Sequence, residues 1–223
     1  MMTREEYFES LRKLNLKVYM FGKRVENPVD DPVIRPSLNS IGMTYELANQ
    51  PEYEDLMTAT SSLNGQKVNR FTHLHQSTED LVKKVKMLRL LGQKTGSCFQ
   101  RCVGMDANNA VFSTTYEIDQ AHGTNYHENF KKFLNDVQLK DLVVDGAMTD
   151  PKGDRSLSPS KQPDPDCYLH VVERRPDGVV VRGAKAHQTG VVNSHDVLVM
   201  PTIAMKPEDK DYAISFAVPT DTE

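Results

Sequence analysis

The stretch DLVVDGAMTD, residues 141–150, divides the sequence into two parts that differ in their pattern of apolar residues. Before it, apolar residues recur at the spacing of one helical face. After it, the apolar runs are short and rich in β-branched residues, as is typical of strands; they lie at 142–144, 169–172, 179–181, 197–199 and 212–216. We therefore predict an α+β fold, with a helical domain at 1–140 followed by an antiparallel β domain at 141–223.

Capping residues and apolar residues at helical spacing predict five helices in the first part. Thr3 and Glu6 fit a capping box at the start of the first helix. The others are expected at about 40–48, from 77 to between 92 and 96, from about 97, and at 125–137. An extended segment is expected at 17–21, and the prolines at 28, 32 and 36 are expected to interrupt the chain before the second helix.

The helix that begins near Ser77 has the strongest pattern. Ser77 is a favoured N-cap residue, and Leu81, Val85 and Leu88 follow at helical spacing, with lysines turned largely elsewhere. Glycine at 96 indicates where this helix ends. The three apolar residues are therefore predicted to form its apolar face.

The composition argues against several classes of function. The net charge of -4, the absence of Trp and the lack of a run of Lys or Arg argue against nucleic-acid binding. No apolar stretch approaches the length that spans a bilayer, and the polar N-terminus lacks the pattern of a signal peptide. Three cysteines, an odd number without an export signal, favour a reducing compartment, and we expect a cytoplasmic protein.

Two cysteines, Cys98 and Cys102, frame the segment CFQRC. On one helix this spacing puts both sulfurs on the same face, where two thiolates can hold one edge of a metal cluster. Arg101 is a candidate for keeping the thiolates ionised. The alternative is that the cysteines are small apolar residues in a helix interface, as buried free cysteines often are. A zinc site that includes His73 and His75 is a further alternative, although its spacing matches no usual finger.

Two polar turns follow predicted strands in the second part. The first, at 146–155, gathers glycines, a hydroxyl and an arginine, which suit the polar edge of a flavin or a phosphate. The second, at 183–190, contains Thr189, which could hydrogen-bond a cofactor ring, and His187, which could act as a base. The alternatives are an ordinary strand-end turn and a structural histidine. Between the turns, the sequence at 176–178, PDG, predicts a hairpin.

Longer segments resemble the 4-hydroxybutyryl-CoA dehydratase family. The resemblance covers essentially the whole chain and is carried by residues 14–15, 18–22, 43–48, 89–95, 99–106 and 200–205, together with the cysteine segment and the two turns. Agreement of this length is more specific than any single motif. More distantly, the chain resembles flavin-dependent 4-hydroxyphenylacetate monooxygenases, which share the fold and the flavin turn but lack the cysteine pair.

The resemblance implies an acyl-CoA dehydrogenase-like fold, with an N-terminal helical domain, a middle β domain and a C-terminal helical bundle that is missing here. It implies that Cys98 and Cys102 are two protein ligands of a [4Fe-4S] cluster. It also implies that Thr189 lies near flavin N5 and takes part in catalysis. The residues implied to bind FAD are Met148, Thr149, Lys152, Gly153, Asp154, Arg155, Gln188 and Thr189.

The reaction implied is the FAD- and [4Fe-4S]-dependent radical dehydration of 4-hydroxybutyryl-CoA to crotonyl-CoA, with isomerisation of vinylacetyl-CoA. The implied partners are an acyl-CoA substrate, the C-terminal half of the enzyme and further copies in a tetramer. No residue of the chain matches the remaining cluster ligands, so we expect the isolated chain to be inactive. It would be a fragment, half of a split enzyme or a non-catalytic remnant, and a flavin-dependent aromatic monooxygenase is the alternative function.

Overall fold

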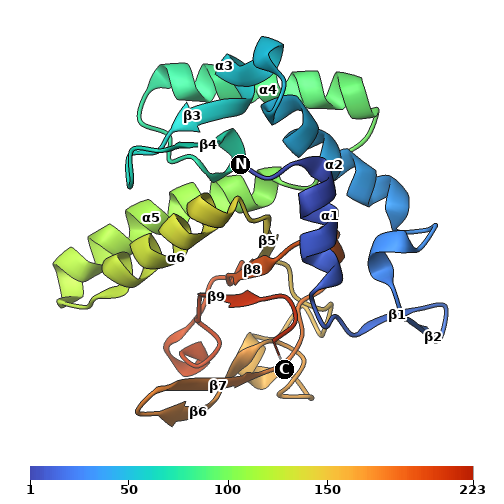
Figure 1. Cartoon of the computed structure of the whole chain (residues 1–223). Helices are drawn as coiled ribbons and strands as arrows, with labels where there is room; N and C mark the ends of the chain where they lie inside the picture. The colour runs from blue at the N-terminus through green and yellow to red at the C-terminus, as the bar shows by residue number, and fades with distance from the viewer. Residues whose placement is uncertain (223) are drawn as a thin grey trace.

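The structure is a computed structural model that describes residues 1–222. Figure 1 shows α5 and α6 as an extended pair that lies between α3 and α4 on one side and a small sheet on the other. Six α-helices precede residue 141 in the described chain: α1 (Arg4–Arg12), α2 (Arg35–Ala48), α3 (Glu54–Met57), α4 (Thr78–Thr95), α5 (Cys102–His122) and α6 (Tyr126–Lys140).

The caps predicted from the sequence are present. Thr3 accepts a hydrogen bond from the amide of Glu6, whose carboxylate accepts one from the amide of Thr3, so the capping box is confirmed. The Ser77 hydroxyl accepts from the amide of Asp80 at the start of α4, and Gly96 ends that helix in the left-handed conformation, with φ of 60°. The start of α1 and both ends of α4 therefore lie where the sequence predicted them.

Two predictions about helices are wrong. α2 begins at Arg35, five residues before the expected start, because Pro36 lies in its first turn, where no amide hydrogen bond is lost. The predicted apolar face of α4 is largely exposed: Leu81 is 48% and Val85 is 64% exposed. This helix instead buries Met87 and Leu91 against α2 and neighbouring elements.

Three β-hairpins are present in the described chain. β1 (Val18–Met20) lies within the extended segment predicted at 17–21 and pairs with β2 (Lys23–Val25). β3 (Thr58–Thr60) pairs with β4 (Lys67–Asn69), and neither of these strands was predicted. β6 (His170–Arg175) pairs with β7 (Gly178–Arg182) around the predicted turn. The helical part therefore contains short strands of its own.

The central sheet is mixed, which corrects the prediction of an antiparallel β domain. Its order is β5-β8-β9, with β5 (Val144–Ala147) parallel to β8 (Asp196–Val199) and β8 antiparallel to β9 (Phe216–Pro219). Parallel neighbours need a long connection, and the chain between β5 and β8 supplies one that contains the β6–β7 hairpin. β9 also lies later in the chain than the run at 212–216 suggested.

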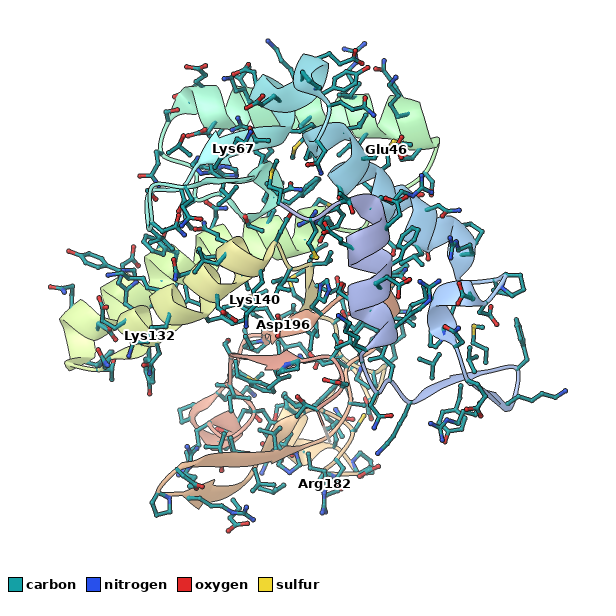
Figure 2. All side chains as sticks on the ribbon, viewed as in Figure 1. Glu46, Lys67, Lys132, Lys140, Arg182 and Asp196 are labelled. Atoms are coloured by element: carbon teal, nitrogen blue, oxygen red, sulfur yellow. The ribbon has the colours of Figure 1, made fainter. Side chains whose placement is uncertain are left out.

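Helices and sheet share one of the apolar cores. Ala107 of α5 and Leu134 of α6 pack in the same buried cluster as Val144 of β5 and Leu198 of β8. Figure 2 shows Lys140, in the last turn of α6, close to Asp196 at the start of β8. Among the described residues, none of the helices has the length and apolar character needed to cross a bilayer.

Candidate functional site

The start of α5 lies directly on β5. A Cβ atom added to Gly104 would overlap the carbonyl oxygen of Val144, and one added to Gly146 would overlap the side chain of Val103. Both glycines have negative φ, so it is the close approach of the two elements that requires them. This contact fixes the first turn of α5, which begins at Cys102, relative to the end of β5.

The two polar turns predicted from the sequence meet beyond the end of β5. The Thr149 hydroxyl donates to the carbonyl of Ala186, and the amide of Ala186 donates back to the carbonyl of Thr149 at 3.1 Å. The Gln188 side-chain amide donates to the carbonyls of Ala186, at 2.7 Å, and Thr149, at 3.2 Å. The Thr149 hydroxyl oxygen also accepts from the Gln188 amide at 3.4 Å, so one of its two lone pairs is left to accept a hydrogen bond from a ligand.

Lys185 connects the two polar turns through hydrogen bonds, although it was not among the site residues predicted from the sequence. Its ammonium donates to the Asp150 carboxylate at 2.7 Å, to the carbonyl of Met148 at 3.1 Å and to the carbonyl of Met200 at 2.9 Å. The side chains of Lys185 and Asp150 are only 10% and 8% exposed. The position of Lys185 inside the second polar turn was the one sign of this role in the sequence. The role could not be predicted from it, because the groups that Lys185 contacts lie in other segments of the chain.

The rest of the first polar turn is more open. Lys152, Asp154 and Arg155 are exposed. The Asp154 carboxylate accepts from the amide and hydroxyl of Ser156, which fixes the turn locally. Gly153 is half-buried, and a Cβ atom there would overlap the side chain of Gln162. Two cationic side chains therefore remain at the surface, on a loop whose backbone is fixed.

The second polar turn presents Thr189 to the outside. Thr189 is exposed, whereas Gly190, the next residue, is buried. His187, two residues earlier, is exposed and has the left-handed backbone conformation, with φ of 64°. The structure therefore leaves the Thr189 hydroxyl accessible beside the clasp of Thr149 and Gln188.

The two cysteines do not lie on one helix, so that prediction is wrong. Cys98 lies in the segment between α4 and α5, and Cys102 is the first residue of α5. The intervening Gln100 has φ of 52°, which a helix does not permit. Cys98 is exposed and Cys102 is half-buried, while Phe99 between them is buried against Phe71. Cys98 is therefore open to the outside, whereas Cys102 packs against the same apolar cluster as Phe71 and Phe99 and is only partly accessible.

We call residues 98–102 the cysteine loop. Two of its side chains, Phe99 and Arg101, are buried and fix it to the core. The guanidinium of Arg101 is buried between the rings of Tyr45 and Phe71 and donates to the hydroxyl of Thr44 at 2.9 Å. The sequence suggested that Arg101 keeps the thiolates ionised, but its guanidinium is directed into the core and not toward the thiols. Burial raises the pKa of the Cys102 thiol, and the neighbouring Cys98 raises it further.

The cysteine loop touches the second polar turn at Gly190. A Cβ atom at Gly190 would lie 3.3 Å from the carbonyl oxygen of Gln100 and 3.1 Å from a carboxylate oxygen of Asp145. The Asn193 side chain also donates to the side-chain oxygen of Gln100 at 3.4 Å. The residues predicted from three separate segments therefore form one continuous region around the end of β5.

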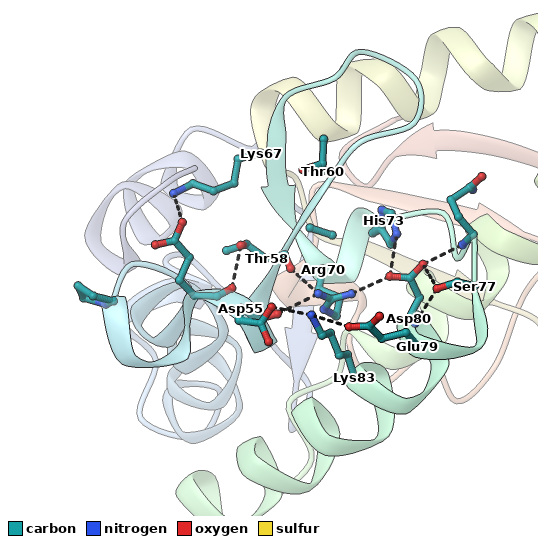
Figure 3. A pocket seen from close by; sticks show the side chains of 14 residues that line it. Asp55, Thr58, Thr60, Lys67, Arg70, His73, Ser77, Glu79, Asp80 and Lys83 are labelled. Atoms are coloured by element: carbon teal, nitrogen blue, oxygen red, sulfur yellow. Dashed lines mark hydrogen bonds and ion pairs between the residues drawn. The ribbon is translucent and has the colours of Figure 1, made fainter.

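His73 belongs to a different region, a polar pocket of about 770 Å³ between α3, β3, β4 and the start of α4, and the centre of the His75 ring lies 6.2 Å from that of the His73 ring. Figure 3 shows its charged side chains paired with one another: Arg70 with Asp80 at 3.1 Å and Lys67 with Glu54 at 2.9 Å. His73 lies 3.3 Å from Asp80. Within residues 1–222 no three side chains of His, Cys, Asp or Glu are grouped to hold a metal, so the zinc alternative has no support.

The chain is similar to proteins of known function over its whole length. The chain is 68% identical over its whole length to a 4-hydroxybutyryl-CoA dehydratase/vinylacetyl-CoA-Δ-isomerase of Clostridium aminobutyricum, of which it spans 46%. It superposes on a solved 4-hydroxybutyryl-CoA dehydratase from N. maritimus with a TM-score of 0.95 at 56% identity, covering 98% of this chain and 43% of that one.

A more distant structure shares the fold. The oxygenase component of 4-hydroxyphenylacetate 3-monooxygenase, solved with FAD, superposes with a TM-score of 0.79 at 26% identity, covering all of this chain and 45% of that one. The chain thus spans less than half the length of each of these relatives. Because residues 3–223 match the family described as the N-terminal region of 4-hydroxyphenylacetate 3-hydroxylase, the chain belongs to that family.

Proposed function

We propose that this chain is the N-terminal part of a 4-hydroxybutyryl-CoA dehydratase that also isomerises vinylacetyl-CoA. One observation carries the proposal: the whole chain is 68% identical to such an enzyme. The adjacency of the cysteine loop and the second polar turn at Gly190 supports it. The whole protein would be the active species, because the chain spans 46% of that relative, and the isolated chain would be inactive.

The flavin would lie against the two polar turns. FAD supplies reversible electron transfer at its ring system when it is bound. The exposed Lys152 and Arg155 are suited to the anionic pyrophosphate, because Arg in particular forms paired hydrogen bonds to phosphate oxygens. Thr149 offers an acceptor oxygen, and its clasp with Gln188 holds both side chains in place. Met148, Gly153 and Asp154 would form the rest of this surface.

Thr189 would act at the flavin ring. Its exposed hydroxyl can donate or accept one hydrogen bond at flavin N5, the atom whose protonation changes with the redox state. The fixed backbone of the buried Gly190 would hold that hydroxyl at one distance from the ring. Thr189 would thus tune the flavin, while most of the binding contacts come from the first polar turn.

Cys98 and Cys102 would supply two of the protein ligands of a [4Fe-4S] cluster. Cys98 is exposed and Cys102 is half-buried, so both are at least partly accessible to a group that sits on the surface of this chain. Such a cluster is usually held by four protein ligands, and within residues 1–222 no third suitable side chain joins the pair. The remaining ligands would come from the C-terminal half. The cluster would supply a Lewis-acid site for the leaving hydroxyl.

The finer organisation follows from the same relatives. We propose an acyl-CoA dehydrogenase-like arrangement in which residues 1–140 and 141–223 correspond to the helical and β domains. The substrate would be an acyl-CoA, and the whole protein would be a cytoplasmic homotetramer. These proposals rest on the likeness to the two dehydratases.

A flavin-dependent aromatic monooxygenase is the second candidate, because the chain is 26% identical to an oxygenase solved with FAD. The test uses the chain joined to, or mixed with, its C-terminal half, in an anaerobic assay with 4-hydroxybutyryl-CoA and in a parallel aerobic assay with reduced flavin and a phenol. We expect formation of crotonyl-CoA from 4-hydroxybutyryl-CoA only when both halves are present. Hydroxylation of a phenol by the reduced flavin and oxygen, without dehydration, would favour the second candidate instead.

A further inference from the structure

Asp145 is a buried acid behind the candidate site that the proposed mechanism does not use. It lies in β5 between Val144 and Gly146, which face α5, so its own side chain points to the opposite side of the strand. On that side a Cβ atom at Gly190 would lie 3.1 Å from one of its carboxylate oxygens. The carboxyl group therefore lies directly behind the Thr189–Gly190 turn.

The same carboxyl group lacks the partners that an ionised acid needs. Asp145 is 5% exposed, and its Oδ2 atom has no hydrogen-bond partner among the described residues. Burial raises its pKa, and of the groups around it only the amide of Gly146 lowers it. An unpaired buried carboxylate is strongly disfavoured, whereas the neutral acid carries no such penalty.

A neutral acid can also make a contact that a carboxylate cannot. Gly190 is the point where the cysteine loop meets the turn, because the Gln100 carbonyl oxygen approaches the same glycine. Oδ1 of Asp145 and the Gln100 carbonyl oxygen both lie against Gly190, and two acceptors side by side repel each other unless one carries a hydrogen, which the neutral acid supplies. The Gly190 carbonyl already accepts from the Asn193 amide at 3.0 Å and from the Ser194 hydroxyl at 2.9 Å, which leaves the Gln100 carbonyl oxygen as the other acceptor beside this glycine.

We propose that Asp145 is a neutral carboxylic acid that positions the Thr189–Gly190 turn against the cysteine loop. It is a positioning residue and touches neither cofactor. The inference rests on the proposed function only in assigning a flavin to the turn and a cluster to the loop. The protonation state and the contact are properties of this chain alone.

Infrared difference spectroscopy of the 223-residue chain at neutral pH tests the protonation state. Subtracting the spectrum of Asp145→Asn should reveal the carbonyl band of a protonated carboxylic acid. The control, Asp177→Asn at the exposed tip of the β6–β7 hairpin, should show no such band. The Gly190→Ala variant adds a methyl group against the carboxyl, and it should shift the band. A spectrum without an acid band, or a band unmoved by Gly190→Ala, would overturn the proposal.

A second measurement separates positioning from simple packing. In the whole protein, Asp145→Ala should weaken flavin binding about two- to tenfold and shift the flavin potential, because one hydrogen bond at the turn is lost. Asp145→Asn keeps the shape and a donor and should restore both. If the Asn and Ala variants lose flavin affinity equally and shift the potential equally, a hydrogen-bond donor at position 145 does not position the turn, and the proposal is wrong. The infrared measurement requires neither a flavin nor dehydratase activity, so its failure is distinct from failure of the proposed function; the second measurement requires only that the whole protein binds a flavin.

Discussion

Gly104 of α5 lies directly on Val144 of β5, so closely that a single added methyl group would overlap the Val144 carbonyl oxygen. Cys102 begins α5 and Met148 directly follows β5, so this contact sets the spacing between the cysteine loop and the first polar turn. Packed interiors transmit such a displacement, because they hold few voids that could absorb it.

Gly104→Ala should destabilise the chain by about 1–3 kcal/mol, because the added methyl group meets backbone that cannot rotate away. Gly92→Ala is the matched control. Gly92 is also helical, but a Cβ atom there meets nothing within 4 Å, so the substitution should be neutral or stabilise by up to about 1 kcal/mol. Urea unfolding followed by circular dichroism measures both. Equal effects of the two variants would show that the close approach is absent.

Lys185→Met should cost about 3–5 kcal/mol, because it leaves the Asp150 carboxylate buried without its cation. Adding Asp150→Asn should recover much of that loss, since the unpaired charge is then removed. Lys161→Met, at an exposed lysine, serves as the control and should change stability by less than about 0.5 kcal/mol. Equilibrium unfolding of the parent, Lys185→Met, Asp150→Asn and the double variant forms a double-mutant cycle, and strictly additive changes in the free energy of unfolding would contradict the pairing of Lys185 with Asp150.

Asp196→Asn should stabilise the chain at neutral pH. Burial raises the pKa of Asp196 from 3.8 to about 6; Asp136 and Asp221 raise it as well, and Lys140 lowers it. The folded state therefore holds a proton that the unfolded state releases, and the parent loses stability as pH rises from about 4 to about 6. The variant lacks this loss, so its advantage should grow from near zero at pH 4 to about 1–3 kcal/mol at pH 7.

The comparison of variant with parent also removes an opposing effect. Burial lowers the pKa of His195 to about 4, which makes the folded state gain stability as pH rises through the same range. Because both proteins contain His195, its contribution cancels in the difference. A pH-independent difference between Asp196→Asn and the parent, measured by thermal unfolding at several pH values, would refute the assignment.

Thr189→Val should shift the redox equilibrium of the flavin in the whole protein by about one order of magnitude, as expected for one neutral hydrogen bond. Flavin affinity should change less, because the binding contacts come mainly from the first polar turn. Thr222→Val, at an exposed threonine near the end of the chain, is the control. Spectroelectrochemical titration gives the potential. An unchanged potential with full dehydratase activity would make Thr189 a surface residue without a role at N5.

Local signals in the sequence were enough to place several elements. Ser77 and Gly96 bracket α4 because capping depends on residues within one turn. The turn at 176–178 was predicted for the same reason, because a short turn also depends on neighbouring residues. The buried face of α4 was not, since Leu81 and Val85 share the helical spacing of Met87 and Leu91, and only tertiary packing decides which set is covered.

Long-range contacts explain most of what the sequence did not predict. The parallel pairing of β5 with β8 joins segments about fifty residues apart, and short apolar runs contain no signal of strand direction. The loop at Cys98 depends on the left-handed Gln100 and on the inner anchors Phe99 and Arg101. The clasp of Lys185 depends on carbonyls from two other segments. Each of these requires knowledge of which segments become neighbours.

The pairing of Cys98 with Cys102 as cluster ligands is the central claim, and the visible and electron paramagnetic resonance spectra of the anaerobically purified whole protein test it most directly. We expect signals of both flavin and an iron–sulfur cluster, with the cluster signal lost in Cys98→Ser and Cys102→Ser. Cys167→Ser should keep the cluster signal, because Cys167 lies beside Gly153 of the first polar turn and not in the cysteine loop. A whole protein with flavin but no cluster, or a cluster that survives both substitutions, would contradict the assignment.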